Sequence, residues 1–166
     1  MNIRLAFPNE VNDIMTIMTD AKTFLAESGS NQWQNDYPNE ETIIEDIIKG
    51  QGYVILVDDM LAGYAAVIEG KEPAYDAIYD GKWLNQNQDY ITFHRVAIAK
   101  SYRGQQIAQT LLEGLMEGFD ANDFRCDTHE KNKIMQHILE KLDFSYQGKV
   151  PIDGECLAYQ RIKARN

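Results

Sequence analysis

The sequence predicts a mixed α/β fold, of the α+β kind, in a single domain that spans residues 1–166. Apolar residues recur at helical spacing in four segments, while seven short segments are rich in β-branched and aromatic residues. Their order along the chain is β-α-α-β-β-β-α-β-α-β-β. The length suits one hydrophobic core, and no internal repeat or Pro/Gly/Ser linker marks a second domain.

The N-terminal segments are expected to form a short strand at residues 2–6 and then two helices. The first helix opens at Pro8 and stops near Gly29. A polar loop over residues 30–38 follows, and Asn39 is a good N-cap for the second helix. The apolar positions of the two helices are Val11, Ile14, Met18, Ala21 and Leu25, then Ile43, Ile44, Ile47 and Ile48.

The middle of the chain predicts a hairpin and then the strongest strand. Residues 53–57 and 61–69 flank an Asp-Asp turn, which indicates an antiparallel pair. Residues 89–99, DYITFHRVAIA, are rich in β-branched and aromatic side chains. Residues 70–88 show no clear periodicity. Four aromatic residues there and just beyond could cover the sheet or line a pocket: Tyr75, Tyr79, Trp83 and Tyr90.

The C-terminal segments alternate between helix and strand and finish in a hairpin. A turn over residues 100–108 passes directly into a helix with Ile107, Leu111, Leu112 and Leu115 on one face. The remaining elements are a strand at 124–128, a helix at 134–142, and strands near 144–150 and 156–162 joined by the turn Pro-Ile-Asp-Gly.

Composition excludes several classes of protein. No stretch reaches the roughly 20 apolar residues of a membrane span, and the first residues lack the apolar run of a secretory signal. We therefore expect a cytoplasmic protein without membrane contact. The two cysteines, Cys126 and Cys156, are too few and too far apart for a disulfide scaffold or a metal site, and no metal is expected.

The charge is distributed unevenly. Residues 1–93 hold 16 acidic and 5 basic side chains, while residues 94–166 hold 10 and 11, within a net charge of −10. An acidic surface repels a nucleic-acid backbone, so nucleic acid is not an expected partner. The asymmetry suits a cationic substrate that meets an anionic cofactor. Solubility alone is an equally good explanation of the acidic residues.

The turn after the strongest strand is a candidate anion site. Backbone N–H groups at the start of a helix have no intrahelical partner, and the helix dipole adds partial positive charge. A pyrophosphate could therefore sit there, with Lys100 or Arg103 nearby. By itself the pattern RGQQIA is weak, because a solvated arginine and a turn glycine before an ordinary helix look the same.

The stretch FHRVAIAKSYRGQQIAQTLL, followed about 30 residues later by NKIMQHILEKLDF, resembles the cofactor-binding half of the GNAT acetyltransferase superfamily. More narrowly, SGSNQW, FHRVAI and DTHEKNKIMQ are similar to small bacterial members of unassigned substrate. The resemblance implies a mostly antiparallel sheet of about seven strands, splayed between the fourth and fifth, with about four flanking helices. It also implies acetyl-CoA as co-substrate and transfer of its acetyl group to an amine.

The resemblance assigns the cofactor site residue by residue. Arg103 matches the Q/R position of the motif Q/R-x-x-G-x-G/A, which cradles the pyrophosphate. Backbone groups of the strand pair with the pantetheine arm like an added strand, and an Asn of the following helix contacts the same arm. The implied cofactor-binding residues are Val96, Ala97, Ile98, Arg103, Gly104, Gln105, Gln106, Ile107, Ala108 and Asn132.

Two positions depart from the family pattern. Gln106 replaces the middle glycine of the motif, so its side chain must turn away where glycine allows close approach. Leu139 replaces the tyrosine that protonates the CoA thiolate. We expect direct attack of a neutral amine on the thioester, with the thiolate protonated by water or another residue. The Val96 N–H is the expected donor to the oxygen of the tetrahedral intermediate.

Two residues are candidate bases for the attacking ammonium, which must lose a proton before it attacks. His94 is the first candidate because histidine titrates near neutral pH, although a strand histidine is often only a structural hydrogen-bonding group. Glu69, at the end of the preceding strand, is the alternative.

The loop between the first two helices usually forms one wall of the acceptor pocket in this superfamily. Its candidate residues are Asn31, Gln32, Trp33 and Tyr37. An aromatic ring there could hold a cation, or Trp33 could only pin the loop to the core. The acceptor is expected to be a small-molecule or peptide amine. A non-catalytic CoA-binding or sensor protein of the same fold is the alternative function, and two sheet edges leave a homodimer open.

Overall fold

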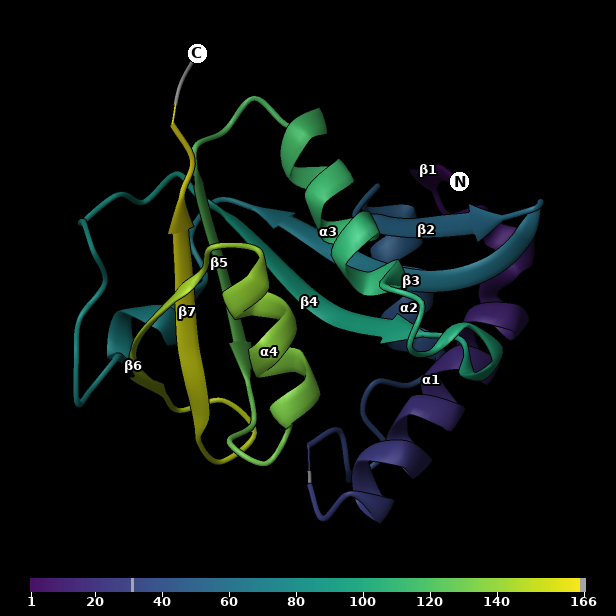
Figure 1. Cartoon of the computed structure of the whole chain (residues 1–166), viewed down its shortest axis with the longest axis horizontal. Coiled ribbons are helices and arrows are strands. Elements are labelled where there is room, and N and C mark those ends of the chain that lie inside the picture. The colour runs from purple at the N-terminus through teal and green to yellow at the C-terminus, as the bar shows by residue number, and fades with distance from the viewer. Residues whose placement is uncertain (31, 165–166) are drawn as a thin grey trace.

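Seven strands form one sheet in the computed structural model, which describes residues 1–30 and 32–164 (Figure 1). Their spatial order is β1-β2-β3-β4-β5-β7-β6, and every neighbouring pair is antiparallel except the parallel pair β4–β5. This confirms the predicted mixed, mostly antiparallel sheet. The strands are β1 Asn2–Leu5, β2 Gly52–Val57, β3 Met60–Glu69, β4 Ile91–Ile98, β5 Asp123–Thr128, β6 Ser145–Val150 and β7 Cys156–Ile162.

Four α-helices occur in the predicted places: α1 Val11–Glu27, α2 Glu40–Ile48, α3 Ile107–Gly118 and α4 Lys133–Lys141. Asn39 caps α2, since its side chain accepts a hydrogen bond from the Thr42 N–H. None of these helices, in the part of the chain that the structure describes, combines the length and apolar character that crossing a membrane requires.

Two helix starts differ from the prediction. A 3₁₀ turn over Pro8–Glu10 precedes α1. After β4 the chain does not enter a helix directly, because a second 3₁₀ turn, Lys100–Tyr102, comes first and α3 begins only at Ile107. Sequence periodicity does not register such short turns, since three residues carry too few apolar positions to show a period.

The alternating strand residues bury two layers of core. Val54, Tyr64 and Ala66 pack with α1 and α2 on one face of the sheet. Ile55, Ala65 and Val67 pack with α3 and α4 on the other face, which is the face toward the viewer in Figure 1. Because side chains alternate along each strand, successive residues of a strand contact different helix pairs.

The segment between β3 and β4 packs on the half of the sheet that contains β6 and β7. It contains a 3₁₀ turn, Pro73–Ala77, whose Tyr75 is fully buried. Tyr75 and Tyr90 form a third cluster with the β6–β7 residues Val150, Cys156 and Ala158. Of the two roles predicted for the aromatic residues of this segment, covering the sheet is therefore the one that the packing shows.

The sheet splays between β4 and β5. The two strands pair only over Ile91–Phe93 and Phe124–Cys126 and then diverge, as Figure 1 shows. A β-bulge lies just beyond: His94 pairs with Ala66 and Ala97 with Tyr64, so β4 carries one residue more than β3 between these pairs. Arg95, inside the bulge, has a left-handed φ of 54°. The expected splay is confirmed.

Candidate active site

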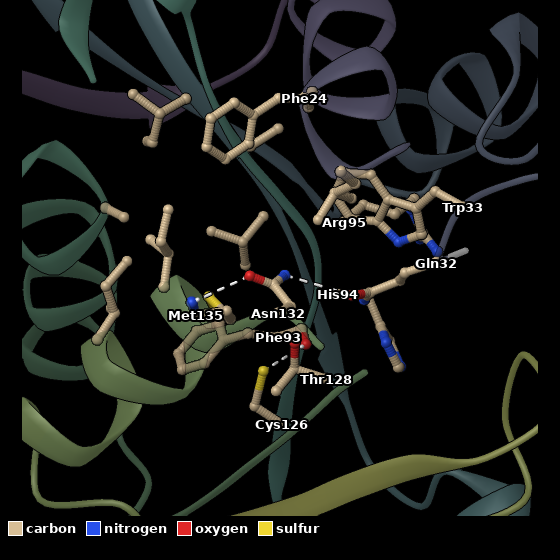
Figure 2. A pocket seen from close by; sticks show the side chains of 18 of the residues that line it. Phe24, Gln32, Trp33, Phe93, His94, Arg95, Cys126, Thr128, Asn132 and Met135 are labelled. Atoms are coloured by element: carbon tan, nitrogen blue, oxygen red, sulfur yellow. Dashed lines mark hydrogen bonds between the residues drawn. The ribbon is translucent and has the colours of Figure 1, made fainter. Parts of the chain in front are cut away.

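A cavity of about 570 Å³ opens where β4 and β5 separate. Its wall is assembled from α1, the loop before α2, β4, the turn before α3, β5, α4 and the β6–β7 turn. Figure 2 shows side chains from several of these segments directed toward a common space. The splay is therefore the feature that creates the site.

The outer edge of β4 faces this cavity. β3 occupies one edge of the strand, and in the described chain β5 pairs with no β4 residue beyond Phe93. Val96, Ala97 and Ile98 all line the cavity. A ligand with alternating amide groups can therefore pair with β4 as an added strand.

Arg103, in the turn before α3, lines one end of the cavity. Its guanidinium lies 4.6 Å above the ring of Phe24, on α1. One guanidinium nitrogen, Nη2, is buried and has no hydrogen-bond partner among the described residues. Buried polar atoms are almost always paired, so this nitrogen is positioned to bond an incoming anion.

The turn after Arg103 carries two left-handed residues. Gly104 has a φ of 80° and Gln106 a φ of 62°. Glutamine reaches this conformation at a cost of roughly 1–2 kcal/mol, which glycine does not incur. Gln106 thus keeps the backbone shape that glycine favours here. Gly104, Gln106, Ile107 and Ala108 line the cavity, whereas the side chain of Gln105 bonds the Ser101 carbonyl and lies outside the described lining.

His94 lies in the cavity wall between two carboxylates. Its Nε2 is 3.2 Å from Oε2 of Glu72, and its Nδ1 is 3.8 Å from Oδ1 of Asp127. The hydrogen bond to His94 lowers the pKa of Glu72. The Tyr75 hydroxyl donates to Asp127 at 2.6 Å, and burial raises the pKa of that phenol, which keeps it a donor.

Glu69, the alternative base, is not brought to this site. It is exposed at the end of β3 and pairs with Ile91 at the start of β4. It is not among the described residues that line the cavity. The two carboxylates that do flank His94 were not predicted from the sequence. Glu72 lies in the segment without periodicity, and the one signal for Asp127 was a charged residue inside a buried strand.

The loop before α2 is bonded to the β5 side of the site. Oε1 of the buried Gln32 accepts hydrogen bonds from the His129 N–H and from Asn132 Nδ2, both at 3.3 Å (Figure 2). The Trp33 N–H donates to Asp153 Oδ2 at 3.0 Å. Asn132 also caps α4 by accepting from the Met135 N–H. Gln32, Trp33 and Asn132 line the cavity; Asn31, also expected here, lies outside the described residues.

A buried ion pair fixes the β4 bulge. Arg95 bonds both carboxylate oxygens of Asp46, at 2.9 and 2.6 Å, and donates to the Tyr37 hydroxyl at 2.7 Å. Tyr64 donates to the same carboxylate at 2.6 Å. Burial alone would lower the pKa of Arg95, but the hydrogen bonds and charges of Asp46 and Tyr37 together outweigh burial, and the pKa is raised. Tyr37 is thereby held in the cavity wall.

The cysteine thiols are poor nucleophiles. Cys126 lines the cavity, but it is 2% exposed, its Sγ contacts the Phe93 carbonyl at 3.4 Å, and burial raises its pKa. Burial likewise raises the pKa of Cys156. Since the thiolate is the reactive form, neither residue is set up for covalent catalysis. Among the described residues, no group of three or more His, Cys, Asp or Glu side chains could hold a metal ion.

The chain is similar to several solved structures. A GNAT-family acetyltransferase of Streptococcus agalactiae 2603 is 57% identical, with a TM-score of 0.96 over 99% of this chain and 96% of that one. PaiA N-acetyltransferase of Thermoplasma acidophilum, in complex with coenzyme A, is 16% identical, with a TM-score of 0.67 over 97% and 98% of the two chains. The Salmonella typhimurium protein yncA, with its cofactor acetyl-CoA, is 13% identical, with a TM-score of 0.69 over 100% and 95%.

No curated protein matches this chain. The model of the acetyltransferase (GNAT) family matches residues 13–144, which include the whole β4-to-α4 region that surrounds the cavity. With the splayed sheet and the 57% identical relative, this match settles the family. The chain belongs to the acetyltransferase (GNAT) family.

Proposed function

We propose that this protein transfers the acetyl group of acetyl-CoA to a primary amine, by direct attack in a ternary complex. The observation that carries the proposal is the unpaired edge of β4. It lies in one cavity with an unsatisfied arginine nitrogen on one side and a histidine flanked by carboxylates on the other. An anionic cofactor and a basic acceptor can therefore meet at the same strand.

The cofactor is proposed to lie along β4 and end at the turn before α3. Val96, Ala97 and Ile98 pair with the amides of the pantetheine arm. Arg103 and the backbone N–H groups of residues 104–108 bind the pyrophosphate, where the helix dipole favours negative charge. Asn132 contacts the arm from α4. Two proteins of the same fold hold coenzyme A or acetyl-CoA, which supports this assignment.

The proposed chemistry uses no covalent enzyme intermediate. His94 accepts a proton from the amine, and the carboxylates of Glu72 and Asp127 stabilise the imidazolium that forms. The amine nitrogen then attacks the thioester carbon, and the Val96 N–H bonds the developing oxyanion. The buried thiol of Cys126 does not compete, because its raised pKa keeps it protonated.

The acceptor is proposed to be a cationic small molecule or peptide. Asp127 and Asp153 line the cavity, and Glu72 lies directly behind His94. The positive charge of Arg95 is balanced by Asp46, so it does not offset these carboxylates. Trp33 and Tyr37 add aromatic surface that holds a cation at roughly 0.5–2 kcal/mol per contact.

The test is acetyl-CoA binding by calorimetry, followed by release of free CoA thiol with a panel of amines. The panel pairs each acceptor that carries a second positive charge, such as a diamine or a peptide with two basic groups, with a monoamine of equal length that lacks this charge. We expect binding and turnover, with a higher kcat/KM for the member of each pair that carries the second charge. Absence of acetyl-CoA binding would refute the proposal.

A non-catalytic CoA-binding protein is the second candidate, favoured by one observation. Leu139, which occupies the position of the family's thiolate-protonating tyrosine, is fully buried in the core and cannot donate a proton. Binding of acetyl-CoA without turnover on any amine of the panel would favour this function. We propose the cytoplasm as its compartment in either case.

A further inference from the structure

Thr128, the last residue of β5, carries a buried hydroxyl that no contact among the described residues explains. The residue is fully buried, and its Oγ1 has no hydrogen-bond partner among the described residues. An unpaired buried hydroxyl costs folding free energy, about 1–3 kcal/mol. Valine has the same shape without this cost. Thr92 carries a hydroxyl that is likewise unpaired among the described residues, but Thr128 differs because it lines the cavity, where a ligand can supply the missing partner.

The position of Thr128 indicates that partner. It lines the cavity two residues beyond Cys126, the last β5 residue that pairs with β4 (Figure 2). It therefore lies at the point where the strands separate. Since side chains alternate along a strand, Thr128 shares a face with Cys126, opposite to Asp127 and its contacts with His94 and Tyr75.

We propose that the Thr128 hydroxyl donates a hydrogen bond to the CoA sulfur as the thioester breaks. The inference rests on the proposed function, which places the acetyl group near Val96 on the facing strand. The neutral amine nitrogen forms a bond to the carbonyl carbon and loses its surplus proton to water, the C–S bond breaks, and the electron pair of that bond stays on sulfur. Thr128 keeps its proton throughout, and water protonates the thiolate afterwards.

The contact favours the transition state over the bound substrate. Thioester sulfur is a weak acceptor, whereas a thiolate is charged and accepts a strong hydrogen bond. The Thr128 bond therefore strengthens only as charge develops on sulfur, which is the condition for an interaction to raise kcat. It supplies a donor on the strand side of the sulfur, where Leu139 on α4 supplies none.

The test compares CoA with desulfo-CoA, which lacks the sulfur, by calorimetry between about pH 7 and about pH 10, a range that brackets a thiol titration. The proteins are the wild type, Thr128→Val, Thr128→Ser and the control Thr92→Val. Thr92 is matched, because it is a fully buried threonine with an unpartnered Oγ1 on the adjacent strand, outside the described cavity lining.

We expect wild-type affinity for CoA, relative to desulfo-CoA, to rise about tenfold as the thiol ionises. Thr128→Val abolishes this rise and leaves desulfo-CoA affinity unchanged, while Thr128→Ser and Thr92→Val retain it. A wild-type CoA to desulfo-CoA ratio that stays constant with pH would overturn the inference without any variant. So would a Thr128→Val protein that keeps the rise.

The same experiment separates this inference from the proposed function. Failure of both ligands to bind wild-type protein refutes the cofactor site, and the inference with it. Binding of both ligands with no effect of Thr128→Val leaves the cofactor site standing and removes Thr128 alone. Thermal unfolding shows that the variant is folded, and we expect its stability to equal or exceed that of the wild type, because an unpaired hydroxyl is lost.

Discussion

The two ends of the cavity are built in different ways. The cofactor end, where we propose that acetyl-CoA binds, is formed by one continuous stretch, residues 96–108. Its shape depends on the unpaired edge of β4 and on left-handed turn residues. The acceptor end brings together the loop before α2, the β3–β4 segment, the β4 bulge, β5 and the β6–β7 turn through buried polar contacts. The end proposed to bind the cofactor is thus local in sequence, whereas the end proposed to bind the acceptor depends on long-range contacts.

The largest expected effect comes from breaking the acceptor end at Asp46→Ala, which leaves the charge of Arg95 unpaired. Removing one partner of a buried pair costs about 3–5 kcal/mol. The expected decrease in Tm is about 10 °C by thermal unfolding. The control is Glu45→Ala, at the residue next to Asp46. It removes an exposed ion pair with Lys49 and should leave Tm almost unchanged. Equal losses in both variants would contradict a special role for the buried pair.

His94→Ala tests the chemistry at the same end. Loss of a general base lowers kcat by about 100-fold or more, whereas acetyl-CoA affinity should stay within about twofold. Steady-state kinetics with the best amine of the panel, together with calorimetry, measures both. The control is Glu69→Ala, which removes the alternative candidate base and should retain wild-type kcat. Loss of kcat in Glu69→Ala, with wild-type kcat in His94→Ala, would instead identify Glu69 of β3 as the base.

Arg103→Glu tests the cofactor end. The change removes a charge-assisted bond and adds repulsion, so acetyl-CoA affinity should fall about 100-fold. The matched variant is Lys100→Glu, which makes the same charge change at an exposed residue outside the described cavity lining. Calorimetry at one ionic strength compares them. Similar losses in the two variants would mean that general electrostatics, and not the stacked guanidinium, binds the cofactor.

The smallest effect concerns the left-handed turn. Gln106→Gly relieves backbone strain of roughly 1–2 kcal/mol, part of which is offset by the greater entropy of glycine in the unfolded chain. We expect a slightly higher Tm and acetyl-CoA affinity improved a fewfold. Gln105→Gly, next to it and without a left-handed φ, should instead lower stability. Destabilisation by Gln106→Gly would show that the glutamine side chain makes a contact worth more than the strain.

Much of the fold was predictable, because it follows from periodicity that each segment carries by itself. The alternation in β2 and β3 and the cap at Asn39 identify their elements without tertiary information. A turn after β4 was predictable for the same reason, since the motif around Arg103 is continuous, whereas its binding of a cofactor stays a prediction. The 3₁₀ turn before α3 was missed, because three residues carry no period.

Only part of the acceptor end could be predicted from the sequence: the candidates His94, Gln32, Trp33 and Tyr37 do line the cavity, but the contacts that hold them were not predictable. Asp46 is a polar position between the apolar residues of α2, and only the bulge at Arg95 brings it a partner 49 residues away. Glu72 lies in a segment with no periodic pattern, and its place in the site depends on its contact with His94, 22 residues further on. In the sequence, Thr128 is an ordinary strand residue; only the structure shows that its Oγ1 has no hydrogen-bond partner among the described residues. Each role belongs to a tertiary contact.

The burial of Cys126 and Cys156 has a practical consequence at the bench. Both thiols are closed to solvent and stay protonated, so a thiol-reactive dye reacts with them slowly as long as the protein is folded. Colour development during turnover therefore counts product CoA, with almost no background from the protein. A sudden stoichiometric signal of two thiols per chain reports unfolding, which gives each kinetic trace its own integrity check.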